Sequence, residues 1–518
     1  MDRSKVGNLR LFRAHRLEAS AILRGMTSPD TRRWQDKLFS LPVTMGYALA
    51  ALVFIVTPRS MSDPDIWWHL RDAQILLQTH HFITEDIFSS TALHAAWMNH
   101  EWIAELPYYW GWTVAGGKGV WFVNAVAIAI VTVGIYLVSY RRSKSAVGSF
   151  LVTLAGMFLS SVSYGPRTLL FGWMCLLAEM YILECVYDKE NPRPAAAWLL
   201  PPLYVVWVNT HGSWLIGIAL LGIFFATTLF RFQWSAISSR GMDAKTRNTM
   251  LGAILASVAA LFVNPYGWKL VAYPFNLAFH QKLNIENVEE WKPVDVHTVR
   301  GEILLLLLAV AIIWQIYKQR EWELHDLAFV GAGLYSALSH SRFLYMFAIT
   351  AAPAFAMRFP PVKRGENYRP KPLLNIATMV VLTIMAVKQS VLVKDTDTQK
   401  AMPLFPVDAV PSLRAMHLQG KVFNSFLWGG YMIWHLRDTP DFIDSRVDIF
   451  EYNGTFKDYL DIIRIKDTEK LLDQQKIRYV LFEQDTPLAY FLEHTSRWKV
   501  DYLKGNVVLL ERTTPLPN

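Results

Sequence analysis

Two aspartates, a histidine and an arginine follow directly after a long apolar run near residue 60. The stretch reads Asp63-Pro64-Asp65-Ile66-Trp67-Trp68-His69-Leu70-Arg71. A carboxylate in such a place can cap a helix, bind a cation or act as a base, and an arginine can grip phosphate. An acid and an arginine at a membrane surface suit a substrate with a lipid tail, a phosphate and a hydroxyl partner.

Asp63 and Asp65 allow different interpretations. Asp63 precedes a proline, and an aspartate before a Pro-initiated helix is a common N-cap, so its structural and catalytic readings weigh equally. Asp65 would lie in the first turn, near the positive helix end, and is the candidate base. Arg71 would follow on a nearby face as a phosphate ligand. His69 could donate to a phosphate oxygen or serve as a local hydrogen-bonding partner.

The composition is that of a membrane protein. Of 518 residues 53% are hydrophobic and only 18% are charged, with 20 tryptophans and 29 phenylalanines. Several apolar runs reach the roughly 20 residues needed to cross about 30 Å of hydrocarbon. The net charge of +8 is spread over short loops, so it indicates topology and no nucleic-acid partner.

Eleven apolar windows predict an α-helical polytopic membrane protein. They cover residues 40–57, 119–140, 147–163, 168–187, 196–209, 212–230, 249–264, 302–317, 325–339, 342–358 and 372–394. Lys and Arg collect in alternate loops, which predicts a cytoplasmic N-terminus. We therefore expect a cytoplasmic tail over 1–39 without a cleaved leader, a membrane domain over 40–394 with a long outer loop at 58–118, and a periplasmic domain over 395–518.

The last 120 residues predict a small α/β domain, because helical and strand-like segments alternate. KVFNSFLWGGYMIWHL reads as a strand, a glycine turn and a helix, and WKVDYLKGNVVLLER as a terminal hairpin. PDFIDSRVDIF and IRYVLFEQD are interpreted as buried strands. TFKDYLDIIRI and TEKLLDQQ have helical spacing.

Further candidates lie in the outer loops. His100 and Glu101 could join Asp65 in one site, or belong to an interfacial helix anchored by tryptophans. Arg167 and Arg342, on a side otherwise poor in basic residues, could bind carrier phosphate or snorkel to lipid headgroups.

Two more segments of the predicted membrane domain, and one of the C-terminal domain, contain candidate residues. The polar break from Asn209 to Gly212 predicts an element that lines an internal cavity. The acids Glu286, Glu289 and Glu290 lie in a later outer loop. Asp444, Arg446 and Asp448 read equally as an intradomain ion pair or as an acceptor site.

The first loop resembles that of the oligosaccharyltransferase catalytic subunit, in which an Asp-x-Trp-x-x-x-Arg stretch stands where Asp65, Trp67 and Arg71 stand here. The overall plan is similar to the GT-C superfamily of membrane glycosyltransferases. The segments 85–91 and 97–102 also resemble a bacterial subgroup of protein-mannosyltransferase-like membrane proteins. These resemblances imply a sugar donor carried on polyprenyl phosphate and an aspartate that orients or deprotonates the acceptor. In oligosaccharyltransferases a later loop closes over the donor, so the resemblance makes the loop with Glu286, Glu289 and Glu290 a candidate lid.

The chain also departs from this pattern. Oligosaccharyltransferases bind a divalent cation, and Asp65 with Asp86 or Glu85 would be its ligands here, yet no Asp-x-Asp stands at the place of that second acid. Several branches of the superfamily work without metal, so Mg²⁺ or Mn²⁺ stays open as a cofactor. Phe426-Leu427-Trp428 replaces the Trp-Trp-Asp with which the sequon-reading block begins, which argues against peptide N-glycosylation.

The sequence therefore predicts a GT-C-type glycosyltransferase in the bacterial inner membrane. Its partners would be the bilayer, a polyprenyl-phosphate-linked sugar, and a glycan, lipid or protein acceptor. The predicted catalytic residues are Asp65, Asp63, Glu101 and His100, and the predicted substrate ligands are Arg71, His69, Arg167, Arg342 and Asp86. The alternative is a non-enzymatic transporter, flippase or assembly partner for lipid-linked glycan.

Overall fold

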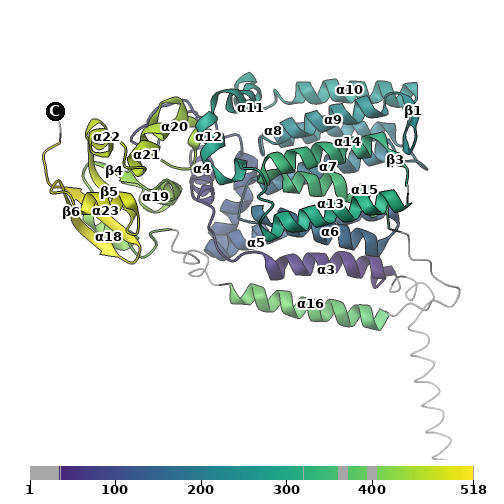
Figure 1. Ribbon diagram of the computed structural model, residues 1–518, viewed down its shortest axis with the longest axis horizontal. Helices are drawn as coiled ribbons and strands as arrows, with labels where there is room; N and C mark the ends of the chain where they lie inside the picture. Colours follow the sequence, from purple (N-terminus) through teal and green to yellow (C-terminus); the bar gives the residue numbers. More distant parts are fainter. Residues whose placement is uncertain (1–33, 35–36, 319, 360–371, 394–404, 517–518) are drawn as a thin grey trace, which may run out of the picture.

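A bundle of long apolar helices carries a small α/β domain at one end (Figure 1). The computed structural model describes residues 34, 37–318, 320–359, 372–393 and 405–516. The predicted tail over 1–39 and the predicted boundary at 394/395 therefore lie almost entirely outside the described residues.

Each of the eleven predicted apolar windows coincides with a helical segment of the described chain. These are α3 (Leu41–Val56), α5 (Trp102–Ser143), α6 (Ala146–Ser160), α7 (Leu169–Val186), the 3-10 helix η2 (Pro194–Leu199) with α8 (Leu200–Val208), α9 (Trp214–Thr228), α10 (Ala244–Ala260), α13 (Val299–Lys318), α14 (Leu324–Ser339), α15 (Leu344–Ala356) and α16 (Pro372–Leu392). Five of the described helices are long and apolar enough to cross a membrane. The number of spans stays a prediction, because the other segments are shorter.

Helix α5 consists of two pieces. Ala115 and Gly116 leave helical geometry, and Gly116 has a φ of 57°, which glycine adopts without steric penalty. The outer piece belongs to the long first loop, and the inner piece begins close to the predicted span at residue 119. The break explains why the apolar window starts in the middle of this helix.

The first outer loop is ordered around α4 (Asp65–Thr79), the helix that contains the Asp65–Arg71 motif. Asp63 accepts a hydrogen bond from the backbone N–H of Asp65 at 3.0 Å, which satisfies one of the free amides at the helix start. Residues Trp67, Trp68 and His69 are buried. The first half of α4 is therefore an internal element, with one turn facing the site described below.

The C-terminal domain contains a mixed sheet in the order β4-β5-β7-β6. Its strands are β4 (Lys421–Asn424), β5 (Ile477–Glu483), β6 (Trp498–Lys504) and β7 (Val507–Arg512), and only the β4–β5 pair is parallel. Its helices are α18 (Val410–Met416), α19 (Gly429–His435), α20 (Val447–Tyr452), α21 (Thr455–Ile463), α22 (Thr468–Gln474) and α23 (Pro487–Glu493). The predicted small sheet domain and its terminal hairpin are confirmed.

One strand prediction in this domain is wrong. The segment PDFIDSRVDIF forms no strand of the sheet; its second half enters α20. Its backbone pairs with the first outer loop instead, where Asp441 makes a single bridge to Ser89 and accepts the Ser90 N–H at 2.7 Å. The acidic side chains of this segment enter a buried ion network, which sequence periodicity cannot reveal.

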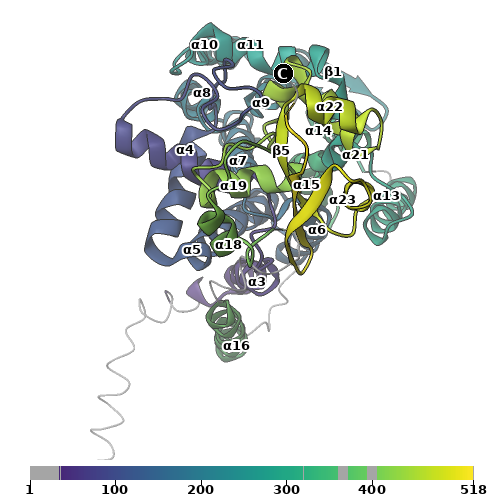
Figure 2. The same cartoon turned by 90° about the vertical axis from the view of Figure 1, so that its left-hand side faces the viewer.

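The C-terminal domain packs tightly on α4. The backbone of Gly430 lies so close to α4 that a Cβ atom there would come within 2.5 Å of the Pro64 carbonyl oxygen. Beside this contact the rings of Trp67 and Tyr431 meet edge to face at 4.9 Å. Figure 2, seen from the side of the C-terminal domain, shows this domain in front of the helix bundle.

A strap connects the bundle with the C-terminal domain a second time. It comprises α11 (Trp268–His280), α12 (Lys282–Asn287) and η3 (Glu289–Trp291). The Glu451 carboxylate accepts the backbone N–H groups of Leu283 and Asn284, both at 2.8 Å. Tyr273 donates to Asp448 at 2.9 Å. The strap is thus held against α20 of the C-terminal domain by hydrogen bonds to Asp448 and Glu451.

At the opposite end of the bundle, a small sheet of β1 (Arg231–Trp234), β2 (Ile237–Arg240) and β3 (Trp322–Glu323) joins the helix ends (Figure 1). Helix α16 contacts α3 at the edge of the bundle. The small sheet lies away from the long first loop, whereas α16 reaches the beginning of this loop, where the Arg59 guanidinium donates a hydrogen bond to Gln389.

Candidate active site

Asp65 presents a partly open carboxyl group at the start of α4. Within the described residues it forms no ion pair with a lysine or arginine. Burial raises the pKa of Asp65 to about 6, and the charge of Asp63 acts in the same direction. His69, a hydrogen bond with Ser445 of the C-terminal domain, and Arg167 oppose this rise. Asp65 is therefore a carboxyl group that exchanges its proton close to neutral pH.

Asp63, in contrast, is fully engaged. Its side chain is 2% exposed, one oxygen accepts the Asp65 N–H, and the other pairs with Nε of Arg167. The same guanidinium pairs through Nη1 with Glu290 of the strap. Asp63 thus combines the capping role with an ion pair, and Arg167 joins two loops.

Arg342 lies in a short turn before α15, with its guanidinium 4.4 Å from the ring centre of Trp291 in the strap. Among the described residues no carboxylate lies within ion-pair distance of it. Its charge nevertheless interacts with Glu101 and Asp65, while burial lowers the pKa of Arg342. Of Arg167 and Arg342, both predicted to contact phosphate, Arg342 is the one whose cation is not paired with a carboxylate of the described chain.

Glu101 is surrounded by three histidines from different elements. One of its oxygens lies 3.3 Å from Nε2 of His211 and 3.6 Å from Nε2 of His100, and the other lies 3.5 Å from Nε2 of His69. Burial raises the pKa of Glu101 and lowers that of His69 and His100. The predicted residues His69, His100 and Glu101 therefore belong to one cluster.

Hydrogen bonds fix two members of this cluster. His69 donates through Nδ1 to Glu105 at 2.8 Å, and the other oxygen of Glu105 accepts from Asn99, also at 2.8 Å. His211 accepts the Ser213 N–H at Nδ1, so its proton is on Nε2 and points at Glu101. The carboxylate of Glu101 is thereby held in one orientation.

Arg71 is not part of this group. It follows Asp65 by six positions, which places it about 240° around the helix, whereas His69 shares the face of Asp65. Its guanidinium donates to Gln74 at 2.6 Å and interacts with Arg437 and Tyr109. The sequence motif holds both residues on one helix but on different sides.

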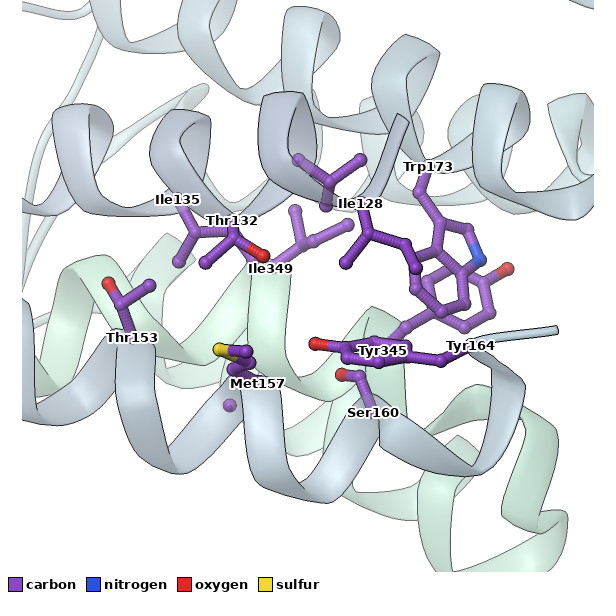
Figure 3. Close-up of a pocket in the computed structure, with 12 residues that line it drawn as sticks. Ile128, Thr132, Ile135, Thr153, Met157, Ser160, Tyr164, Trp173, Tyr345 and Ile349 are labelled. Atoms are coloured by element: carbon purple, nitrogen blue, oxygen red, sulfur yellow. The ribbon is translucent and has the colours of Figure 1, made fainter. Parts of the chain in front are cut away.

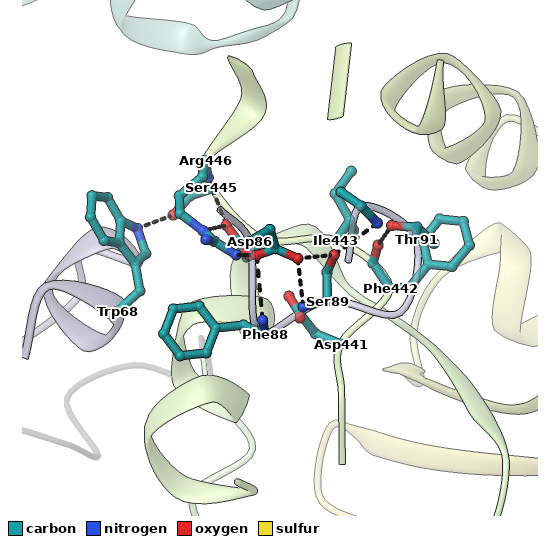
Figure 4. A network of polar contacts seen from close by, with 12 residues as sticks. Trp68, Asp86, Phe88, Ser89, Thr91, Asp441, Phe442, Ile443, Ser445 and Arg446 are labelled. Atoms are coloured by element: carbon teal, nitrogen blue, oxygen red, sulfur yellow. Dashed lines mark hydrogen bonds and ion pairs between the residues drawn. The ribbon is translucent and has the colours of Figure 1, made fainter. Parts of the chain in front are cut away.

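Asp86 has a structural environment that differs from the predicted one (Figure 4). Its side chain is fully buried, and one oxygen pairs with Arg446 at 2.7 Å. The other accepts from the hydroxyl and the N–H of Ser89, at 2.7 and 3.0 Å. Arg446 also pairs with Asp444 at 2.6 Å. Asp86 thus links the first loop to the C-terminal domain, and its oxygens are occupied by protein groups.

The predicted cation ligands do not fit a metal site. Asp65 contacts Ser445 and Asp86 contacts Arg446, so the two carboxyl groups have separate partners. No cluster of three or more His, Cys, Asp and Glu side chains in the described ranges is arranged to hold a metal ion. The carboxyl groups of this region have protein partners instead: Ser445 for Asp65, Arg446 and Ser89 for Asp86, and His69 for Glu105.

A small cavity lies inside the helix bundle (Figure 3). Helices α5, α6, α7 and α15 line it, and most of its lining is aliphatic or aromatic. Tyr164 and Tyr345 belong to this lining and stand three residues from Arg167 and Arg342 respectively. An apolar space therefore lies close to the two cations.

Four residues of this site are not in the predicted set, namely Glu105, His211, Glu290 and Ser445. Glu105 follows Glu101 by four positions, the spacing of one helix face. His211 lies in the polar break between α8 and α9, and Glu290 in the candidate lid, so both had a sequence signal. Ser445 had none, since its contact with Asp65 joins residues 380 positions apart.

Comparison with models of known protein families, and with curated proteins, finds no match. Solved structures do match. An Archaeoglobus fulgidus oligosaccharyltransferase tethered to an acceptor peptide aligns with 86% of this chain and 70% of its own, at a TM-score of 0.52 and 13% identity. ArnT from Cupriavidus metallidurans aligns in the apo state with 90% of this chain and 97% of its own, at 0.52 and 14%. ArnT bound to undecaprenyl phosphate aligns at 0.50 and 13%, over 92% and 99%.

Both neighbours are GT-C glycosyltransferases, so the structural similarity confirms the predicted resemblance. At these identities the similarity establishes the fold.

Replacing Asp86 by alanine tests its structural role. The change leaves Arg446 buried with one carboxylate fewer, and breaking such a pair typically costs about 3 to 5 kcal/mol. We expect a clearly lower thermal unfolding midpoint in detergent, and unchanged affinity of the folded protein for undecaprenyl phosphate. Asp438→Ala, at an exposed position, is the control and should change stability by less than about 0.5 kcal/mol. Unchanged stability together with lost carrier binding would contradict this role.

Proposed function

We propose that this protein is a GT-C-type glycosyltransferase that moves a sugar from a polyprenyl-phosphate carrier to an acceptor hydroxyl. The observation that carries the proposal is the pair of Asp65 and Arg342. Asp65 is a carboxyl group with a pKa of about 6 and no arginine or lysine partner among the described residues, and it lies within electrostatic reach of the half-buried Arg342, which has no carboxylate partner there. The fold supports the same class of reaction.

In this mechanism the acceptor hydroxyl gives its proton to Asp65 while its oxygen attacks the anomeric carbon of the donor. The bond from that carbon to the phosphate oxygen breaks, and polyprenyl phosphate leaves with the electron pair. A single displacement of this kind inverts the anomeric configuration. General-base assistance contributes roughly 10² to 10⁴ in rate. The Arg342 guanidinium stabilises the negative charge that grows on the leaving phosphate.

The surroundings suit a donor with a lipid tail. The phosphate would bind at Arg342, and the isoprenoid chain would lie between the apolar helices that surround the site, α5, α6, α7 and α15, whose present cavity of about 10 Å³ has room for no more than a water molecule. One structural neighbour is known with undecaprenyl phosphate bound. The site would face the periplasm if the Lys and Arg distribution of the loops sets the orientation.

The C-terminal domain argues for a hydroxyl acceptor over a sequon amide. In the segment that resembles the sequon-reading block, Trp428, Gly430 and Tyr431 are buried, and Gly430 packs against the backbone of α4. This block therefore serves packing between the two parts of the chain. The chemical identity of the donor sugar and of the acceptor is outside the proposal.

The alternative of a transporter for lipid-linked glycan has less support. Such transporters place binding groups near the membrane midplane on broken helices of repeated halves. Here the charged cluster forms between the first loop, the strap and the C-terminal domain. Release of undecaprenyl phosphate from a sugar-linked donor distinguishes transfer from transport, because a transporter leaves the donor intact.

Replacing Asp65 by asparagine tests the base directly. We expect transfer to fall at least 10²-fold, because the amide keeps the shape but cannot accept the proton. The measurement is release of free undecaprenyl phosphate from a panel of undecaprenyl-phosphate-linked hexoses and pentoses in native membranes. Folding is checked by the elution profile of the purified variant. Activity at the level of the unchanged protein would rule out Asp65 as the base.

The pH dependence of the reaction provides a second test. Because the base must be ionised, kcat/KM should rise about tenfold per pH unit below about pH 6 and level off above it. Asp63→Asn should move this limb to lower pH, since the Asp63 charge raises the pKa of Asp65 and its loss frees Arg167 to lower it. A limb that stays in place in Asp63→Asn would show that another group titrates.

A further inference from the structure

The guanidinium of Arg167 lies between two carboxylates that come from separate loops. Its Nε contacts Asp63 at the end of the segment after α3, and its Nη1 contacts Glu290 in the strap. The Asp63 side chain is 2% exposed, and the Arg167 and Glu290 side chains are 22% and 24% exposed. An arginine stays charged under all conditions that a folded protein meets, and its planar fork matches carboxylate geometry.

Two carboxylates that face each other across a loop interface are also the oxygen ligands that Mg²⁺ or Mn²⁺ prefers. Here the position between them is filled by a side chain of the same protein. The cation implied by the resemblance to oligosaccharyltransferases therefore has no vacant pair of acids at this place. The charge that would join the two loops is supplied by the arginine.

The contact has a consequence for Arg342. Glu290 precedes Trp291, the ring on which Arg342 rests, and the Trp291 carbonyl accepts a hydrogen bond from His340 at 2.5 Å. Ser341 donates its N–H to the carbonyl of Lys292 at 2.9 Å. By holding Glu290, Arg167 therefore holds the strap against the turn that contains Arg342.

We infer that Arg167 is a built-in cation that positions the strap over Asp65 and Arg342, so that carrier binding needs no divalent metal. The inference rests on the proposed function and deepens it. It assigns Arg167 a positioning role, since its Nε and Nη1 are bound to protein carboxylates and Arg342 is the arginine for the phosphate. Truncating Arg167 should leave Asp63 and Glu290 as a vacant pair that a divalent cation can bridge.

The test uses the full chain purified in detergent, with Mn²⁺ alone and undecaprenyl phosphate alone as probes. The unchanged protein should bind undecaprenyl phosphate equally well with and without a chelator, and should bind no Mn²⁺ at this place by electron paramagnetic resonance. Arg167→Ala should bind one additional Mn²⁺. In chelator its affinity for undecaprenyl phosphate should fall about tenfold or more, and Mn²⁺ should restore most of it.

Two further variants make the result specific. Arg497→Ala removes an arginine that also bridges two acids, Glu469 and Asp473, at 3.0 and 2.7 Å on the C-terminal domain. It should change neither carrier affinity nor its dependence on Mn²⁺. Glu290→Gln should weaken carrier binding as Arg167→Ala does, but without recovery by Mn²⁺, because one ligand is missing. This second variant keeps the test decisive if Arg167→Ala does not fold.

The inference is overturned if chelation abolishes carrier binding by the unchanged protein, or if Glu290→Gln binds the carrier normally. It is also overturned if a folded Arg167→Ala gains no Mn²⁺. These outcomes differ from failure of the proposed function, which would appear as intact donor in the transfer assay while carrier binding remains. Binding and turnover are thus read separately.

Discussion

Removing carboxylates from water without leaving their charge unbalanced is the constraint on which this structure depends. A buried ionised group needs a partner or must take up a proton. Asp63 and Asp86 each have an arginine. Asp72, Glu105 and Asp441 follow the second course, since burial raises the pKa of all three well above the usual range. Asp65 lies between these cases and can exchange a proton near neutral pH.

The same pairs hold the parts of the chain together. Arg446 connects the first loop to the C-terminal domain, and Arg167 connects the first loop to the strap. The Gly430 contact fixes α4 against α19 without any charge. Because these contacts converge on α4, the orientation of Asp65 depends on three segments that are far apart in sequence. Positioning by rigid elements is what a catalytic carboxyl group requires.

Local signals predicted much of the fold. Hydrophobic length located the apolar helices, and alternation with turn residues located β4, β5 and the hairpin of β6 and β7. Both signals arise from neighbouring residues, so they need no knowledge of tertiary contacts. The segment that includes Asp441 and Asp444 misled the strand prediction, because its short apolar runs match a strand while its acids pair with the distant first loop. The break at His211 was visible, but its contact with Glu101 was not.

Within the site the sequence was informative about residue types and weak on partners. The motif from Asp65 to Arg71 predicted that a base, Asp65, and a phosphate ligand, Arg71, act in one site. The six positions between them place the two side chains on different faces of the helix. Asp86 looked like a second acid for a cation, and only the position of Arg446, 360 residues later, reveals a structural pair. Arg342 has no acid of the described chain within ion-pair distance, and its predicted contact with carrier phosphate stays a prediction. Long-range pairing of charges is the part that a single sequence does not encode in readable form.

The central claim is that a polyprenyl phosphate binds with its phosphate between Arg342 and Asp65. A cryo-electron microscopy map of the purified protein with undecaprenyl phosphate tests it most directly. The account predicts phosphate density within hydrogen-bond distance of the Arg342 guanidinium, the Asp65 carboxyl group facing the same space, and the lipid chain entering the bundle beside Tyr345. Phosphate density on Arg71 and Arg437, or at the end of the bundle that carries β1, would contradict it.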